Sequence, residues 1–156
     1  MIPKMRRIKR ELDNRAAYEV LENAKRGVLA VNGPDGYPYA VPINFVMHDG
    51  RICFHCAKVG LKHDCLVKDA KVCFTANGEN WHEGDDWAWW LRSVTAFGHC
   101  SFVTDEAEKN QILYDLGMKY FPTEEEVISV MEKNGKNCDV AAITIDHITG
   151  KLIHEK

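Results

Sequence analysis

The feature that most constrains the fold of this chain is the dipeptide Asp49-Gly50, which lies between two alternating apolar segments. Glycine takes positive φ without steric cost, so this turn predicts a β-hairpin with strands over 37–48 and 51–57. Alternation gives the hairpin one apolar side, formed by Val41, Ile43, Phe45 and Met47 on the first strand and by Ile52, Phe54 and Cys56 on the second. Cys53, His55 and Ala57 take the other face of the second strand.

The remaining pattern predicts four more strands and four helices. Strands are expected over 27–32, 71–77, 92–104 and 139–148, and helices over 13–26, 61–68, 105–120 and from Thr123 to Asn134-Gly135. Gly27 suits the C-terminal cap of the first helix. Short connections join most strands, and a parallel βαβ alternation would need fewer strands, so the sheet is expected to be mainly antiparallel. Pro42 lacks a ladder donor and predicts an edge or a bulge.

Length and charge favour a single packed domain over residues 1–156. The 156 residues are the usual size of one domain, and a hydrophobic content of 46% is typical of globular proteins. The net charge of −3 provides no general field for nucleic acid. Residues 1–12 form a basic N-terminal arm, which is interpreted as solvated, with RNA or an anionic membrane as the alternative partners.

The sequence predicts a cytoplasmic protein with reduced cysteines. No apolar segment is long enough for a membrane helix, and no apolar h-region follows the basic start. Most of the six cysteines are therefore expected to act as small hydrophobic residues in strands.

Residues 57–62 leave the second hairpin strand, bend at Gly60 and enter the predicted helix over 61–68. Free N–H groups at a helix N-terminus, with Lys58 and Lys62 beside them, suit a phosphate or a carboxylate. An ordinary strand-to-helix connection with solvated lysines explains the same residues equally well.

No metal site is expected. Cys53-x-x-Cys56 puts its side chains on opposite faces of a strand, and no second pair stands at zinc-finger spacing. The acidic cluster His82, Glu83, Asp85 and Asp86 matches neither the EF-hand nor the His-Glu-x-x-His spacing. That cluster lies in the irregular segment 78–91, which contains all four tryptophans and predicts a subunit interface or a lid over a pocket.

Five segments resemble, in this order, the nitroimidazole-resistance (Nim-type) group of the pyridoxamine-phosphate-oxidase-like flavoproteins. They are YAVPINFV at 39–46, HDGRICFHCAKVGLK at 48–62, KVCFTANG at 71–78, RSVTAFGHCSFV at 92–103 and DHITGK at 146–151. The resemblance extends over residues 6–151. It implies a six-stranded antiparallel split β-barrel with peripheral helices that binds FMN.

The resemblance also implies a set of site residues. Lys62 and the turn formed by Cys56, Ala57 and Lys58 would hold the FMN phosphate, with His55 beside them as the catalytic candidate. The isoalloxazine would lie along the first hairpin strand at Val41, Pro42, Ile43 and Asn44. Arg92 and Ser93 would approach from the other subunit of a homodimer that has two FMN sites at its interface.

The activity that the resemblance implies is reduction of a small molecule such as a nitro compound, with a reduced nicotinamide or another electron donor. Oxidation of vitamin B6 is not expected, because the chain lacks a longer C-terminal portion that holds that substrate. Two alternatives stay open. One is a non-catalytic flavin-binding sensor or storage protein, and the other is a haem-binding split barrel in which His99 or His147 ligates iron.

Overall fold

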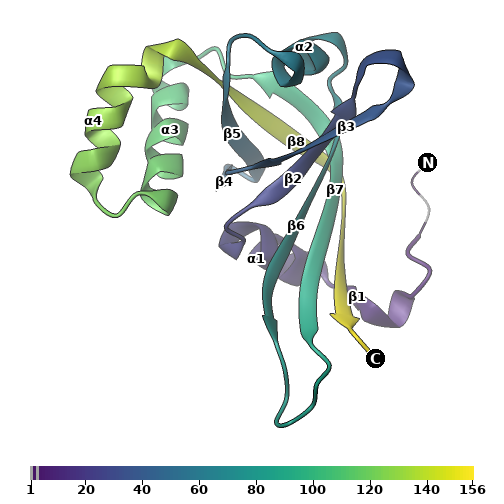
Figure 1. Cartoon of the computed structure of the whole chain (residues 1–156). Helices are drawn as coiled ribbons and strands as arrows, with labels where there is room; N and C mark the ends of the chain where they lie inside the picture. The colour runs from purple at the N-terminus through teal and green to yellow at the C-terminus, as the bar shows by residue number, and fades with distance from the viewer. Residues whose placement is uncertain (1, 3) are drawn as a thin grey trace.

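The computed structural model describes residue 2 and residues 4–156, which form one antiparallel sheet with four α-helices (Figure 1). The strands are β1 (Glu11–Leu12), β2 (Gly27–Asn32), β3 (Pro38–Ile43), β4 (Val46–His48), β5 (Arg51–Ala57), β6 (Lys71–Trp81), β7 (Trp90–Phe102) and β8 (Cys138–His154). The helices are α1 (Asn14–Asn23), α2 (Leu61–Lys68), α3 (Glu106–Tyr120) and α4 (Glu124–Asn134), with 3-10 segments at Ile8–Arg10, Pro34–Gly36 and Gly135–Asn137.

The sheet runs in the order β3-β2-β6-β7-β8-β5-β4, and β1 pairs with β8. The antiparallel arrangement is confirmed, but the prediction of six strands is wrong, because the sheet has eight and is not closed. The strand expected over 37–48 is interrupted at Asn44-Phe45, so that β3 pairs with β2 and β4 pairs with β5 at the opposite edge. Pro42 lies in the edge strand β3, as its missing N–H requires.

The hairpin turn has the predicted geometry. Asp49 and Gly50 have φ values of 48° and 72°, the left-handed pair that matches the twist of a two-residue hairpin. The side expected to be apolar faces the main core, where Phe45, Ile52 and Phe54 are fully buried. Phe45 packs edge-to-face on Phe74 with ring centroids 4.8 Å apart, which joins the broken strand to β6.

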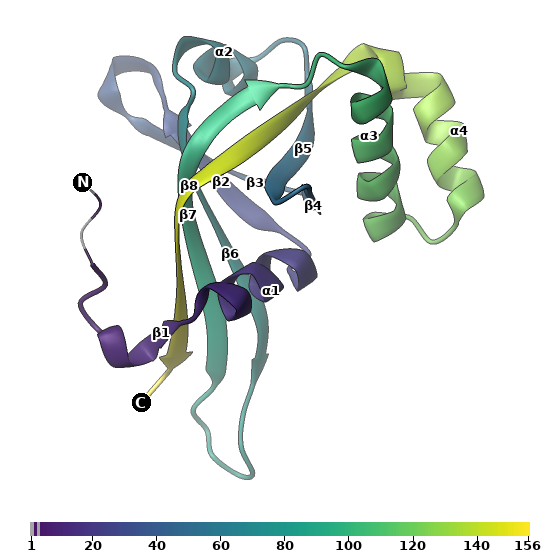
Figure 2. The same cartoon turned by 180° about the vertical axis from the view of Figure 1, so that it is seen from behind.

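Helix α1 covers one face of β6, β7 and β8 (Figure 2). Its start is as predicted, because the Asp13 carboxylate accepts a hydrogen bond from the Ala16 N–H at 2.8 Å. Its end differs from the prediction, since Ala24 is the C-terminal cap and Gly27 is the first residue of β2. Gly27 lies under the ring of Phe74, where an added Cβ would be 2.1 Å from Cζ. The glycine is required by close packing and not by the helix end.

Helices α3 and α4 form an antiparallel pair beside β4 and β5, on the left in Figure 1. Asp105 and Thr123 cap the two starts as predicted, each accepting from the N–H three residues later. Two side-chain contacts attach α3 to the hairpin, a hydrogen bond between His48 and Asp115 at 3.0 Å and an ion pair between Arg51 and Glu108. The α3–α4 helix pair is thus held against the outer face of β5.

The tryptophan segment is more regular than predicted. β6 continues to Trp81 and β7 begins at Trp90, so the two strands extend as an arm below the rest of the sheet and only 82–89 form a loop (Figure 1). Trp90 stacks on His154 with centroids 3.9 Å apart and lies parallel to Trp81 at 6.4 Å. These cross-strand aromatic contacts hold the arm together and explain why both ends of the segment are strand and not loop.

Several limits of the strands also differ from the prediction. β8 extends to His154 because its second half pairs with β7 along the arm and with β1. Residues 11 and 12 of the predicted basic arm therefore belong to the sheet, while positions 1 and 3 of that arm lie outside the described residues. None of the helices in the described chain is long and apolar enough to cross a membrane.

Candidate functional site

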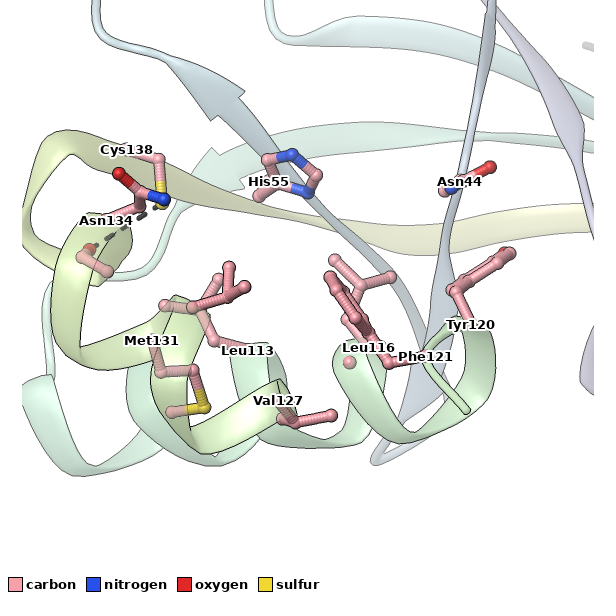
Figure 3. A pocket seen from close by; sticks show the side chains of 13 residues that line it. Asn44, His55, Leu113, Leu116, Tyr120, Phe121, Val127, Met131, Asn134 and Cys138 are labelled. Carbon is pink, nitrogen blue, oxygen red and sulfur yellow. Dashed lines mark hydrogen bonds between the residues drawn. The ribbon is translucent and has the colours of Figure 1, made fainter. Parts of the chain in front are cut away.

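One pocket lies between the end of β5, the Asn44-Phe45 link and the α3–α4 pair, and has a volume of about 270 Å³. Figure 3 shows its two sides, with His55 on β5 and Asn44 between β3 and β4 on one side and apolar side chains of α3 and α4 on the other, among them Leu113, Leu116 and Val127. The sequence explains the helix approach. Gly117 faces Val127, and an added Cβ would be 2.5 Å from its Cγ1, so glycine lets the two helices pack closely.

His55 is the histidine of the pocket and stands on the sheet. It stands on the outer face of β5, opposite the buried side chains of Phe54 and Cys56, as alternation predicts. Loss of water around the ring lowers the pKa of His55, and the nearby Lys62 ammonium lowers it further. The imidazole is therefore neutral at pH 7, with one nitrogen as a hydrogen-bond donor and the other as an acceptor.

Tyr120 fixes the helices to the broken strand. Its hydroxyl accepts from the buried Phe45 N–H at 3.0 Å and lies within donating distance of the Phe45 carbonyl at 2.9 Å and the Lys25 carbonyl at 2.5 Å. A buried N–H without a partner is costly, so the hydroxyl stabilises the interruption between β3 and β4. Because Asn44 precedes Phe45, this contact also sets the position of one pocket residue.

The loop from β5 to α2 places backbone N–H groups and two lysines near the pocket. Gly60 has a φ of 111° and caps α2 without a side-chain hydrogen bond, so the first N–H groups of the helix are available. Lys58 is exposed, and the charge of Lys62 is close enough to influence both His55 and Cys56. Within the described chain neither lysine has a carboxylate partner within 4 Å. The residues present fit a phosphate.

Of the predicted FMN residues, Asn44 and His55 line the same pocket. Val41, Pro42 and Ile43 lead along β3 to Asn44, which lines the pocket with His55, and Ala57 and Lys58 are exposed where β5 ends. Ile43 and Cys56 have their side chains in the core, so only their backbone groups face outward. The roles assigned to these residues stay predictions.

Arg92 and Ser93 do not line the pocket that contains Asn44 and His55. They pair with Leu152 and Lys151, whereas His55 pairs with Val140 near the opposite end of β8. Arg92 instead lines a groove between α1 and the arm, with its guanidinium 5.7 Å from the Trp81 ring centroid. Within one chain, these two residues and His55 do not meet.

The helical wall of the pocket was not predicted from the sequence as part of a site. It is formed by Leu113, Leu116, Gly117, Tyr120, Phe121, Val127, Val130 and Met131. The sequence contains one signal of this wall, which is Gly117 inside α3. A glycine inside a helix costs about 1 kcal/mol and marks a close approach to another element. The tryptophans, expected to form a lid or an interface, contribute nothing to this lining.

Comparison with known proteins identifies the family and the fold of this chain. The family model described as pyridoxamine 5'-phosphate oxidase matches residues 13–152. The chain belongs to this family. The family-level resemblance of the five sequence segments is thereby confirmed. Among curated proteins, none matches the chain.

Three solved structures illustrate the range of similar folds. A candidate 5-nitroimidazole antibiotic resistance protein from Bacteroides thetaiotaomicron has 21% identity and a TM-score of 0.74, with 92% of this chain and 87% of that chain covered. An FAD-binding protein from Mycobacterium smegmatis has 19% identity and a TM-score of 0.63, covering 93% and 98%. The flavocytochrome Anf3 from Azotobacter vinelandii has 20% identity and a TM-score of 0.78, covering 96% and 72%. At these identities the likeness establishes the fold.

Proposed function

We propose that this protein is a flavoprotein that binds FMN along the segment from β3 to α2 and reduces a small molecule in the adjacent pocket. The observation that carries this proposal is the convergence of Asn44 and His55 in one pocket near the backbone N–H groups at the start of α2, Lys58 and Lys62. Family membership and similarity to proteins described as FAD-binding support a flavin. When bound, the flavin would supply hydride transfer, and this chain would bind it and orient the substrate.

We assign charged groups of the chain to the phosphate and neutral groups to the isoalloxazine and the substrate. The N–H groups at the start of α2, with Lys58 and Lys62, would hold the phosphate, and β3 from Val41 to Asn44 would support the isoalloxazine. His55, neutral at pH 7, would donate a hydrogen bond or a proton to the substrate. Similarity to a candidate nitroimidazole-resistance protein favours a nitro compound as substrate.

The proposed assembly is a homodimer with FMN at the interface. Arg92 and Ser93 on β7 pair with the end of β8 that is remote from His55, so any contact that they make with the flavin would come from the partner subunit. If each FMN is held by both subunits, FMN must favour the dimer by the same free energy by which dimerisation favours FMN. Sedimentation of apo-protein and holo-protein across a dilution series tests this, and a monomer that keeps its FMN contradicts it.

The visible spectrum of the purified protein is the first test of function. Flavin bands support the proposal, and a Soret band supports the haem alternative. Of the two histidines considered for iron, His99 is exposed beside Asp146, and neither lines the pocket that contains His55. Bleaching by a reduced nicotinamide without oxygen, followed by reoxidation with a nitro compound, then distinguishes a reductase from a flavin-storage protein.

His55→Gln tests the catalytic assignment. Glutamine keeps a polar group of similar reach, so we expect the fold and most of the flavin to be retained while the rate of substrate reduction falls by on the order of 10²–10⁴-fold. His99→Gln, on the exposed face of β7, is the control and is expected to turn over normally. A His55→Gln protein with the wild-type rate would contradict the catalytic role.

A further inference from the structure

We propose that the pocket between β5 and the α3–α4 pair selects a small, uncharged and mainly apolar molecule, and that it excludes anions of the same size. This inference deepens the proposed function, on which the role of that molecule as substrate rests. The selectivity itself belongs to the pocket of a single chain.

The helical wall provides an apolar surface without charge. Leu113, Leu116, Val127 and Met131 line the pocket from α3 and α4 (Figure 3). Among the described residues, the lining includes no Asp, Glu, Lys or Arg. A ligand that enters therefore exchanges water for hydrocarbon on this side.

The polar groups of the lining are neutral, and several already have partners. The Tyr120 hydroxyl is held by the Phe45 and Lys25 backbone, and Cys138 Sγ lies 3.6 Å from the Gly135 carbonyl. Burial raises the pKa of the Cys138 thiol, and burial with the Lys62 charge lowers the pKa of His55, so both groups are uncharged at pH 7.

Three polar side chains remain to orient a ligand. Asn44, His55 and Asn134 line the pocket, and the ring or amide of each makes no hydrogen bond to another described residue. Apolar walls with a few unpaired polar groups are the usual composition of a small-molecule site. One amide or imidazole N–H can thus be offered to an acceptor atom on an otherwise apolar ligand.

Charge and size set the limits of the ligand. A carboxylate or phosphate placed against the apolar side chains would lose water without a cation in the lining to pair with it. The nearby cations Lys58 and Lys62 belong to the α2 loop outside the lining, where they suit the phosphate of a flavin. A volume of about 270 Å³ is just below the range of about 300–1,000 Å³ typical of drug-sized ligands. The pocket thus fits a compact molecule and not a whole flavin nucleotide.

The test compares indole with indole-3-carboxylate on the full chain, with and without FMN. Methyl NMR signals of Leu113, Leu116, Val127 and Met131 report occupancy of the pocket. We expect indole to shift these signals and indole-3-carboxylate to bind at least about tenfold more weakly. Equal affinity of the two probes, or indole binding that leaves the pocket methyls unchanged, would overturn the inference.

Two lysine substitutions on α4 provide the matched comparison. Val130 lines the pocket and is 37% exposed, whereas Ile128, 46% exposed, lies outside the lining. Val130→Lys puts a cation at the rim and should reduce the preference for indole by about two- to fivefold, the value of an exposed ion pair. Ile128→Lys should leave the preference unchanged, and an equal effect of both lysines would refute the pocket as its source.

Two further outcomes are informative. If Val130→Lys does not fold, Phe121→Lys, also at an exposed lining position, provides the same comparison. Indole selectivity in a protein that shows no affinity for FMN would support the pocket inference and reject the proposed flavin function. FMN binding with no effect of indole on the pocket methyls would overturn the inference alone.

Discussion

Replacing Lys119 with methionine should stabilise this protein near neutral pH. Lys119 lies near the end of α3 with its ammonium buried and, within the described chain, without a hydrogen-bond partner. The nitrogen is 4.2 Å from the Phe45 ring centroid. Burial, and to a smaller degree the neighbouring Lys25 charge, lowers the pKa of Lys119 to about 8. The folded protein therefore holds this cation at a cost below pH 8.

The magnitude follows from the difference between the folded and unfolded pKa. A fall from 10.5 to about 8 corresponds to on the order of 3 kcal/mol at pH 7. The cation–π contact with Phe45 offsets roughly 0.5–2 kcal/mol of this cost. Methionine retains an unbranched apolar stem and removes the charge, so we expect Lys119→Met to raise the free energy of unfolding by about 1–2 kcal/mol at pH 7.

The pH dependence gives the sharper test. Between about pH 8 and pH 10.5 the unfolded wild type binds more protons at Lys119 than the folded protein, so wild-type stability at this group rises with pH. The advantage of Lys119→Met should therefore shrink through this interval. Urea unfolding followed by tryptophan fluorescence at pH 7 and pH 10 measures it. Lys133→Met, an exposed control on α4, should change stability by no more than about 0.5 kcal/mol. An advantage that is absent at pH 7, or equal at both pH values, would refute the reasoning.

Three further substitutions test single contacts. Lys62→Ala should weaken FMN binding about ten- to a hundredfold and leave riboflavin binding unaffected. Lys68→Ala, at the other end of α2, is the control. Equal losses of affinity for both flavins would place Lys62 away from the phosphate. Tyr120→Phe leaves the buried Phe45 N–H unpaired and should cost about 1–3 kcal/mol in urea unfolding, an effect that an unchanged midpoint would exclude. Gly27→Ala should cost about 1–3 kcal/mol because of the Phe74 ring, whereas Gly78→Ala, whose added Cβ would be 3.6 Å from the Arg92 carbonyl oxygen, should cost less.

The elements that the sequence predicts well are those with local causes. The Asp49-Gly50 turn, the Asp105 cap and the limits of β2 and α2 depend on residues within one turn or strand of each other, and the structure agrees with them. The predicted flavin contacts came from the family resemblance, since no hydrophobic periodicity indicates a cofactor. Among these residues, Asn44 and His55 do meet in one pocket, although their roles stay predictions.

The features that the sequence does not predict depend on distant contacts. The interruption at Phe45 is stabilised by Tyr120, 75 residues further along the chain. The second half of β8 forms because the arm and β1 provide partners for it. The pocket wall requires α3 and α4 to be placed against β5, which no pattern within either helix specifies.

The position of β8 has a consequence for the chain during its synthesis. β8 joins β5 to β7 and is the last strand in the sequence. Before β8 is synthesised, the sheet can form only as two pieces, the β4–β5 hairpin and the β3-β2-β6-β7 unit. Each piece exposes an unpaired edge, which invites pairing with other chains. Because α3 and α4 lie between β7 and β8, both edges stay open while the helix pair is translated. Ribosome pausing in that interval should promote aggregation, and a pause after His154 has left the ribosome should not.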